Sequence, residues 1–271
     1  MTPHREKPGS VRAKVQRARA NLRMLEADRS SFLASRPFEI ATRHDPKTGE
    51  AIYYAARVDP IPLSIAATAA DILHNLRRAL DYLAVELIRT AGNSPIRNSG
   101  FPICASFAIY QTQGPEKLQG VSKDALDAIA AIQPYRGGNA ALWSLQSLSA
   151  IDKHRLVSLV AVAVRFQNVT PAVMAYARRM WNDLYAAWRP PESFSAESAD
   201  FIEGIKRQFR LTNGDVVFIT APDTETVDIR EFSFDLAFGE GETGRSTLLE
   251  TLGHLLEEVE SVAEKLGALL M

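Results

Sequence analysis

The stretch from Ile65 to Arg89 constrains the fold most, because its apolar residues recur at helical spacing along its whole length. With about 100° of rotation per residue, these residues fall within one arc, which is typical of a helix packed on a core. The arc consists of Ile65, Ala69, Ile72, Leu76, Leu80, Leu83 and Leu87. A seam beside it contains Ala70, His74, Arg77, Asp81, Ala84 and Ile88. The sequence therefore predicts a central helix that protein covers on two faces.

The remaining face of this helix is expected to be solvated, and its residues are Asp71, Asn75, Arg78, Tyr82 and Glu86. The charged trio of the seam, His74, Arg77 and Asp81, must instead be paired or hydrogen-bonded, because burying an unpaired charge is very costly. We expect these three residues to bond to one another or to a second polar cluster. That cluster is Asp152, Lys153, His154 and Arg155.

Four segments together resemble a widespread family of uncharacterised bacterial proteins. They are the helix motif Asp-x-x-His-Asn-Leu-Arg-x-Ala-Leu-Asp-x-Leu from Asp71 to Leu83, the Phe-Pro-Ile segment from Phe101 to Ile103, the Gln-Pro-Tyr turn from Gln133 to Tyr135, and the Ile-Asp-Lys-His-Arg segment from Ile151 to Arg155. The resemblance covers most of the chain. It supports the fold prediction and brings no established activity, substrate or cofactor with it.

The composition favours a soluble cytoplasmic protein with a sizeable core. The chain has 271 residues, 46% of them hydrophobic, and a formal net charge of -1, so the molecule as a whole has no field that attracts nucleic acid or an anionic membrane. The single cysteine, Cys104, excludes an internal disulfide framework. No apolar run is long enough to span a membrane, and residues 1–10 show no signal-peptide core.

The other elements predict an α+β fold, with a helical layer packed on a mainly antiparallel sheet of hairpins. We expect a loose tail at residues 1–10 and a single domain from 11 to 271. Helices are predicted at 11–33, 65–89, 122–132, 140–153, 171–188 and 246–270, with Ser122 as the N-cap of the third. Strands are predicted at 38–43, 51–58, 157–166, 209–211, 216–219 and 227–238, with Asn213 and Gly214 as a hairpin turn. The apolar run at 157–166 is ambiguous between a buried strand and a buried helix, and its valines favour the strand. Residues 95–120 are predicted to be loop-like.

Two motifs that suggest a cofactor or a metal fail on physical grounds. The Gly-x-Gly-x-x-Gly pattern from Gly239 to Gly244 lacks the following βαβ unit and carries two glutamates that would repel a pyrophosphate. Carboxylates and imidazoles from the two polar clusters are suitable ligand types, but Asp71 lies about 60° from His74 on a helix, and Arg77 would oppose a cation. We therefore predict no metal site and no cofactor.

The two polar clusters leave two interpretations open. Arg77, Lys153, His154 and Arg155, partly neutralised by Asp81 and Asp152, could form a pocket for a phosphate or carboxylate. The same residues could instead form a structural ion-pair network that joins two helices. The sequence slightly favours the structural network.

We expect a non-catalytic interaction protein, or one that binds a small anionic ligand, built around the buried His/Arg/Asp cluster. One alternative is a hydrolase or ribonuclease that uses His74 and His154 as general acid and base. Another is a nucleic-acid binder, since residues 1–29 carry eight Lys or Arg against three acids. That basic helix could instead be a solvated face or pack near the acidic C-terminal helix. The amphipathic terminal helices are also suited to forming a homodimer.

Overall fold

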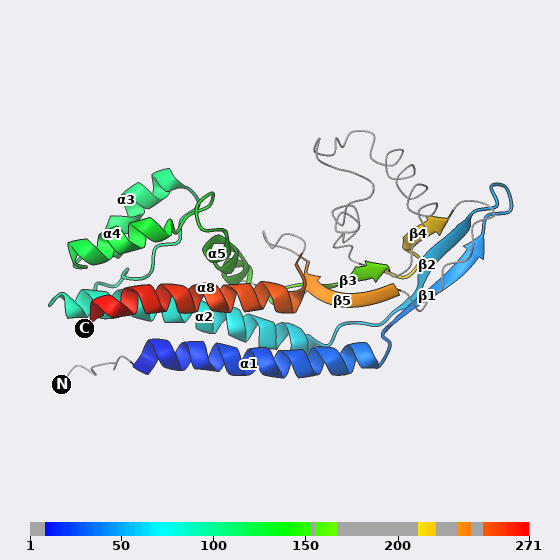
Figure 1. The fold of residues 1–271 in the computed structure, drawn as a ribbon, viewed down its shortest axis with the longest axis horizontal. Helices are drawn as coiled ribbons and strands as arrows, with labels where there is room; N and C mark the ends of the chain where they lie inside the picture. Colours follow the sequence, from blue (N-terminus) through cyan, green and yellow to red (C-terminus); the bar gives the residue numbers. More distant parts are fainter. Residues whose placement is uncertain (1–8, 153–154, 167–210, 221–231, 240–245, 271) are drawn as a thin grey trace. The chain divides into compact units, whose positions relative to one another are not determined.

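The structure is a computed structural model that describes residues 9–152, 155–166, 211–220, 232–239 and 246–270. These residues form six α-helices and two antiparallel sheets, which confirms the predicted α+β class (Figure 1). Backbone contacts divide the chain into a helical unit, made of Met1–Asp28, Pro62–Ser158 and Glu240–Met271, and a strand unit, made of Arg29–Ile61 and Leu159–Gly239. The single domain expected from the sequence stays a prediction.

Helix α2 (Leu63–Thr90) is the centre of the helical unit, and α5 (Ala140–Asp152) and α8 (Leu248–Gly267) both pack against it. The predicted apolar arc is confirmed, because every one of its residues is buried. Residues Ala70, Ala84 and Ile88 of the seam are buried as well. Protein therefore covers α2 on both of the faces that the sequence predicted.

The expected solvated face of α2 is wrong at Asn75 and Glu86, whose exposed fractions are only 9% and 7%. Helix α1 (Gly9–Ala34) supplies the reason. Lys14 Nζ donates to Asn75 Oδ1 at 3.2 Å, and Ser10 Oγ donates to Glu86 Oε1 at 2.8 Å. The first turns of α1 thus cover this face through polar side chains, which a pattern of apolar residues does not report.

Side-chain caps begin four of the described helices, and at α5 the cap is Asn139, whose Oδ1 accepts a hydrogen bond from Leu142 N at 3.0 Å. Thr247 forms a capping box with Glu250 at the start of α8, which continues into the short 3-10 helix η2 (Ala268–Leu270). Ser122 caps α4 (Lys123–Ile132), as the sequence predicts. The prediction of a loop at residues 95–120 is wrong for α3 (Phe107–Lys117), which Ser106 caps by accepting a hydrogen bond from Ile109 N.

The strand unit begins with the predicted hairpin of β1 (Phe38–His44) and β2 (Ala51–Val58). Strand β4 (Val216–Thr220) pairs with the other edge of β2, giving the order β1-β2-β4. Strands β3 (Leu159–Phe166) and β5 (Phe232–Phe238) form the second sheet, so the ambiguous apolar run at 157–166 is a strand as predicted.

The predicted hairpin across Asn213 and Gly214 stays untested, because residues 209–210 of its first strand lie outside the described residues. Asn213 instead joins β4 to the earlier hairpin, since its Oδ1 accepts a hydrogen bond from Val58 N at 2.7 Å. The predicted helix at 171–188 and most of the glycine motif at 239–244 also lie outside the described residues.

Within the strand unit, an ion pair joins the end of α1 to β5. Arg29 Nε donates to Asp235 Oδ1 at 2.5 Å, and Arg29 Nη2 donates to Asp235 Oδ2. Both side chains are largely buried. A two-pronged arginine–carboxylate pair in such a place fixes geometry as well as charge.

Replacing Asp235 with Ala is expected to lower the free energy of unfolding by about 3 kcal/mol, because the Arg29 guanidinium would stay buried without its counter-charge. Urea unfolding at neutral pH measures the difference. The matched control is Glu39→Ala, which removes the exposed partner of Arg57 at 3.9 Å and should cost about 0.5 kcal/mol or less. Equal effects of the two variants would contradict the assignment.

Candidate functional site

Arg77 and Asp81 lie one turn apart on α2 and hold the main chain of Phe101 between them. Their closest atoms, Arg77 Nη2 and Asp81 Oδ1, are 3.2 Å apart. Arg77 Nη2 also donates to the carbonyl oxygen of Phe101 at 2.8 Å, and Phe101 N donates to Asp81 Oδ1 at 3.1 Å. This arrangement, the Phe101 clamp, satisfies both backbone polar groups of a fully buried residue.

Gly100 allows the chain to approach the clamp closely. A Cβ atom at this position would lie 2.9 Å from Asp81 Oδ1, which is closer than a carbon and an oxygen normally come. The absence of a side chain at Gly100 is therefore part of what lets Asp81 reach Phe101 N.

The clamped segment pairs in turn with the Gln-Pro-Tyr turn. Cys104 N donates to Pro134 O at 3.0 Å, and Arg136 N donates to Cys104 O at 2.9 Å. Gln133 adopts the left-handed conformation that ends α4 and starts this turn. Three of the four segments singled out in the sequence, at 71–83, 101–103 and 133–135, thus come together around Phe101 and Cys104.

Burial shapes the electrostatics of this region. It lowers the pKa of the Arg77 guanidinium, which the Asp81 carboxylate raises again in part. Burial also raises the pKa of the Cys104 thiol, whereas Lys117 and Arg77 lower it. Since a thiolate is the reactive form of cysteine, the buried Cys104 is a small apolar packing residue at neutral pH rather than a nucleophile.

His74 does not belong to the clamp, and it is exposed on α2, contrary to the expectation of a buried trio. It lies instead near Asp152 at the end of α5. Burial raises the pKa of the Asp152 carboxyl, while the charge of His74 lowers it and that of Asp71 raises it. One residue of each predicted polar cluster is therefore brought near the other.

The rest of the second cluster is described only at Arg155, which is exposed. Lys153 and His154 lie outside the described residues, so general acid–base chemistry by His74 with His154 stays a prediction. Among the residues that the structure describes, no group of three or more His, Cys, Asp or Glu side chains is arranged to hold a metal ion.

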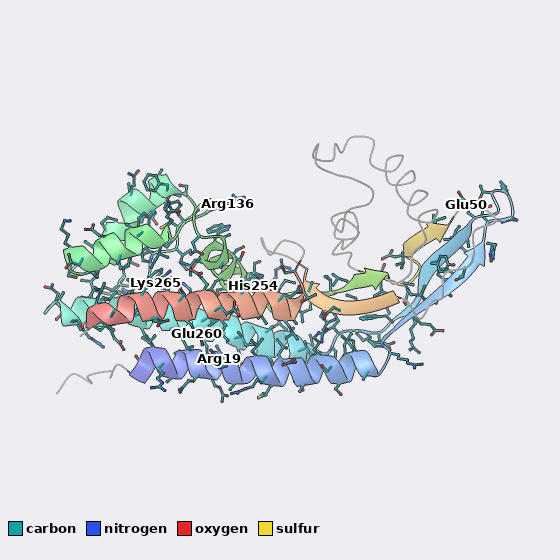
Figure 2. All side chains as sticks on the ribbon, viewed as in Figure 1. Arg19, Glu50, Arg136, His254, Glu260 and Lys265 are labelled. Atoms are coloured by element: carbon teal, nitrogen blue, oxygen red, sulfur yellow. The ribbon has the colours of Figure 1, made fainter. Side chains whose placement is uncertain are left out.

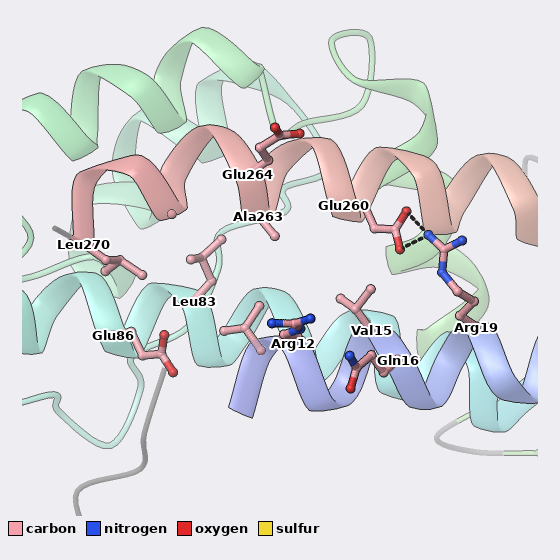
Figure 3. Close-up of a pocket in the computed structure, with 12 residues that line it drawn as sticks. Arg12, Val15, Gln16, Arg19, Leu83, Glu86, Glu260, Ala263, Glu264 and Leu270 are labelled. Carbon is pink, nitrogen blue, oxygen red and sulfur yellow. Dashed lines mark hydrogen bonds and ion pairs between the residues drawn. The ribbon is translucent and has the colours of Figure 1, made fainter. Parts of the chain in front are cut away.

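A groove with a volume of about 400 Å³ lies elsewhere in the helical unit, between α1, α2 and α8 (Figure 3). Apolar residues and charged or polar residues both line it, and each of the three helices contributes residues of both kinds. The residues that define it here are Arg12, Val15 and Gln16 from α1, Leu83 from α2, and Ala263 and Glu264 from α8. We call this feature the α1/α8 groove.

Two of the groove's charged side chains close one end by pairing with each other. Arg19 of α1 points toward Glu260 of α8 (Figure 2), and one guanidinium nitrogen donates to both carboxylate oxygens at 2.5 and 2.6 Å. This contact agrees with the alternative that the basic helix packs near the acidic C-terminal helix. Arg12 and Glu264 also line the groove, and neither has a partner among the described residues.

This groove is not predictable from the sequence, because its walls come from the two ends of the chain. The charge signal was present, as a basic first helix and an acidic last one, but it did not show which side chains remain unpaired.

No family model, no curated protein and no solved structure matches the chain. Within the described residues, no helix has the length and apolar character needed to cross a bilayer.

Replacing Asp81 with Ala is expected to lower the free energy of unfolding by about 3 to 5 kcal/mol, because it leaves Arg77 uncompensated and Phe101 N without an acceptor. The control is Asp127→Ala, which breaks an ion pair of the same i,i+4 spacing with Lys123 on the surface of α4. That change should leave the free energy of unfolding almost unchanged, because water already solvates both charges. A small effect of Asp81→Ala in chemical denaturation would contradict the clamp.

Gly100→Ala tests the close approach without removing a charge. We expect it to lower the unfolding free energy by about 1 to 3 kcal/mol, since Asp81 must shift away from the added methyl group. Gly253→Ala in α8, where a Cβ would meet nothing within 4 Å, should instead be neutral or raise stability by up to about 1 kcal/mol. Thermal and urea unfolding of the two variants give the comparison, and equal stability would count against the clamp geometry.

Proposed function

We propose that this protein is a non-catalytic interaction protein of the cytoplasm and that the α1/α8 groove receives its partner. The observation that carries the proposal is a pair of oppositely charged side chains, Arg12 and Glu264, that have no partner among the described residues and line the groove together with apolar side chains. A protein surface that combines apolar contacts with charges of both signs suits recognition of another protein.

The Phe101 clamp supports a non-catalytic role for the polar cluster on α2. Arg77 Nη2 and Asp81 Oδ1 are engaged with each other and with the main chain of Phe101. An anion at Arg77 Nη2 would compete with these bonds, whereas Arg77 Nη1 is buried and has no hydrogen-bond partner among the described residues. We therefore assign the ion pair to the scaffold and ligand recognition to the groove.

The nucleic-acid alternative has weaker support, because two arginines of the basic helix are engaged with acids. Arg19 pairs with Glu260, and Arg29 pairs with Asp235. Each pair removes positive charge that phosphate binding would require. The groove walls also carry Glu86 and Glu264, which would repel a phosphate backbone.

Site-specific photo-crosslinking tests the proposal. A benzophenone amino acid replaces Gln16, which lines the groove, and in a second variant it replaces Arg17, which is exposed but does not line it. In cells that naturally make the protein, we expect a crosslinked protein adduct at Gln16 and a much weaker one at Arg17. Mass spectrometry identifies the partner.

Equal labelling at the two positions, or no protein adduct at either, would contradict an interaction through the groove. Both variants must first show the thermal unfolding midpoint of the unmodified protein, so that a local loss of structure is not mistaken for a lost partner.

A further inference from the structure

We propose that the partner in the α1/α8 groove is a second copy of this chain, in a two-fold dimer that places Arg12 of each copy opposite Glu264 of the other. This inference rests on the proposed function and names its partner. In an isologous contact the same patch occurs on both sides, so a residue pair across the interface is formed twice. A patch suited to this contact must be complementary to itself.

The charges of the groove meet that requirement. Arg19 and Glu260 neutralise each other, and Glu86 accepts a hydrogen bond from Ser10. Within the part of the chain that the structure describes, this leaves one cation without a partner, Arg12 on α1, and one anion without a partner, Glu264 on α8. A purely anionic or cationic ligand would leave one of these charges facing a like charge. A second copy satisfies both.

The apolar side chains of the groove provide the contact area. Val15, Ala263 and Leu270 are only half-buried in the groove, and Leu83 lies fully buried at its base. In Figure 3, Ala263 lies between Arg12 and Glu264, whereas Val15 and Leu270 lie on either side of Arg12. Covering these apolar side chains removes apolar surface from water, which favours association without a directional requirement.

Two copies can also match in shape, because helices form both walls of the groove. Groove residues recur at spacings of three and four on both walls, so each wall presents a ridge of side chains about 12 to 15 Å long at 1.5 Å per residue. Two such faces related by a two-fold axis can interlock, with the wall of one copy entering the groove of the other. The groove would form the centre of the interface, and the adjoining surface of α1 its rim.

Sedimentation equilibrium of the full chain tests the dimer through a charge exchange. The unaltered protein should be dimeric at micromolar concentration. Arg12→Glu and Glu264→Arg should each raise the dimer dissociation constant by about tenfold or more, since each puts two pairs of like charges across the interface. The double variant Arg12→Glu/Glu264→Arg should return it to within about threefold of the original, because it restores opposite charges.

Matched controls separate the specific contact from net charge. Arg17→Glu and Glu257→Arg make the same charge changes on exposed positions of α1 and α8 that do not line the groove. Neither should change the dissociation constant by more than about twofold. A monomer at all concentrations, or a double variant as weak as its parents, would overturn the dimer.

The crosslinking at Gln16 distinguishes a failure of the dimer from a failure of the proposed function. An adduct between two copies of the chain supports both the dimer and the proposed function. An adduct with a different protein, together with a monomer in sedimentation, overturns the dimer and leaves the proposed function standing. No adduct and a monomer overturn both.

Discussion

The helical unit depends on packing two faces of α2 against protein while compensating the charges of Arg77 and Asp81. Arg77 and Asp81 solve this problem together, because they neutralise each other and bind both polar groups of the Phe101 main chain. An uncompensated charge at this depth would cost several kcal/mol. The ion pair therefore compensates both charges, and its hydrogen bonds hold the Phe101 segment, which has little regular structure of its own.

The polar side of α2 is covered in a different way, because α1 supplies its hydrogen-bond partners. Lys14 and Ser10 of α1 cover Asn75 and Glu86, and Arg19 reaches Glu260 of α8. Polar contacts of this kind hold α1 in place without closing the space beside it, and the groove is the result. The same basic and acidic helices thus serve the fold and leave Arg12 and Glu264 available for a partner.

Local signals in the sequence predicted most of the helical unit. The apolar arc of α2 and the cap at Ser122 depend on spacing along one element, and both are confirmed. Helix α3 was missed because its apolar residues are confined to its first turn, so they form no stripe, and because Gly114 and Pro115 inside it are typical of a loop. The exposure of His74 and the burial of Glu86 depend on which helix covers α2, and spacing alone does not contain that information.

The central claim is that the α2 ion pair belongs to the scaffold and that the groove is the dimer interface. Hydrogen–deuterium exchange of the full chain tests this claim most directly. The exchange is measured at two concentrations, one below and one well above the expected dimer dissociation constant. The account predicts that the amide of Phe101 is protected equally at both concentrations, whereas residues 11–19 and 260–270 gain protection at the higher one. Rapid exchange at Phe101, or protection of the groove that does not change with concentration, would contradict it.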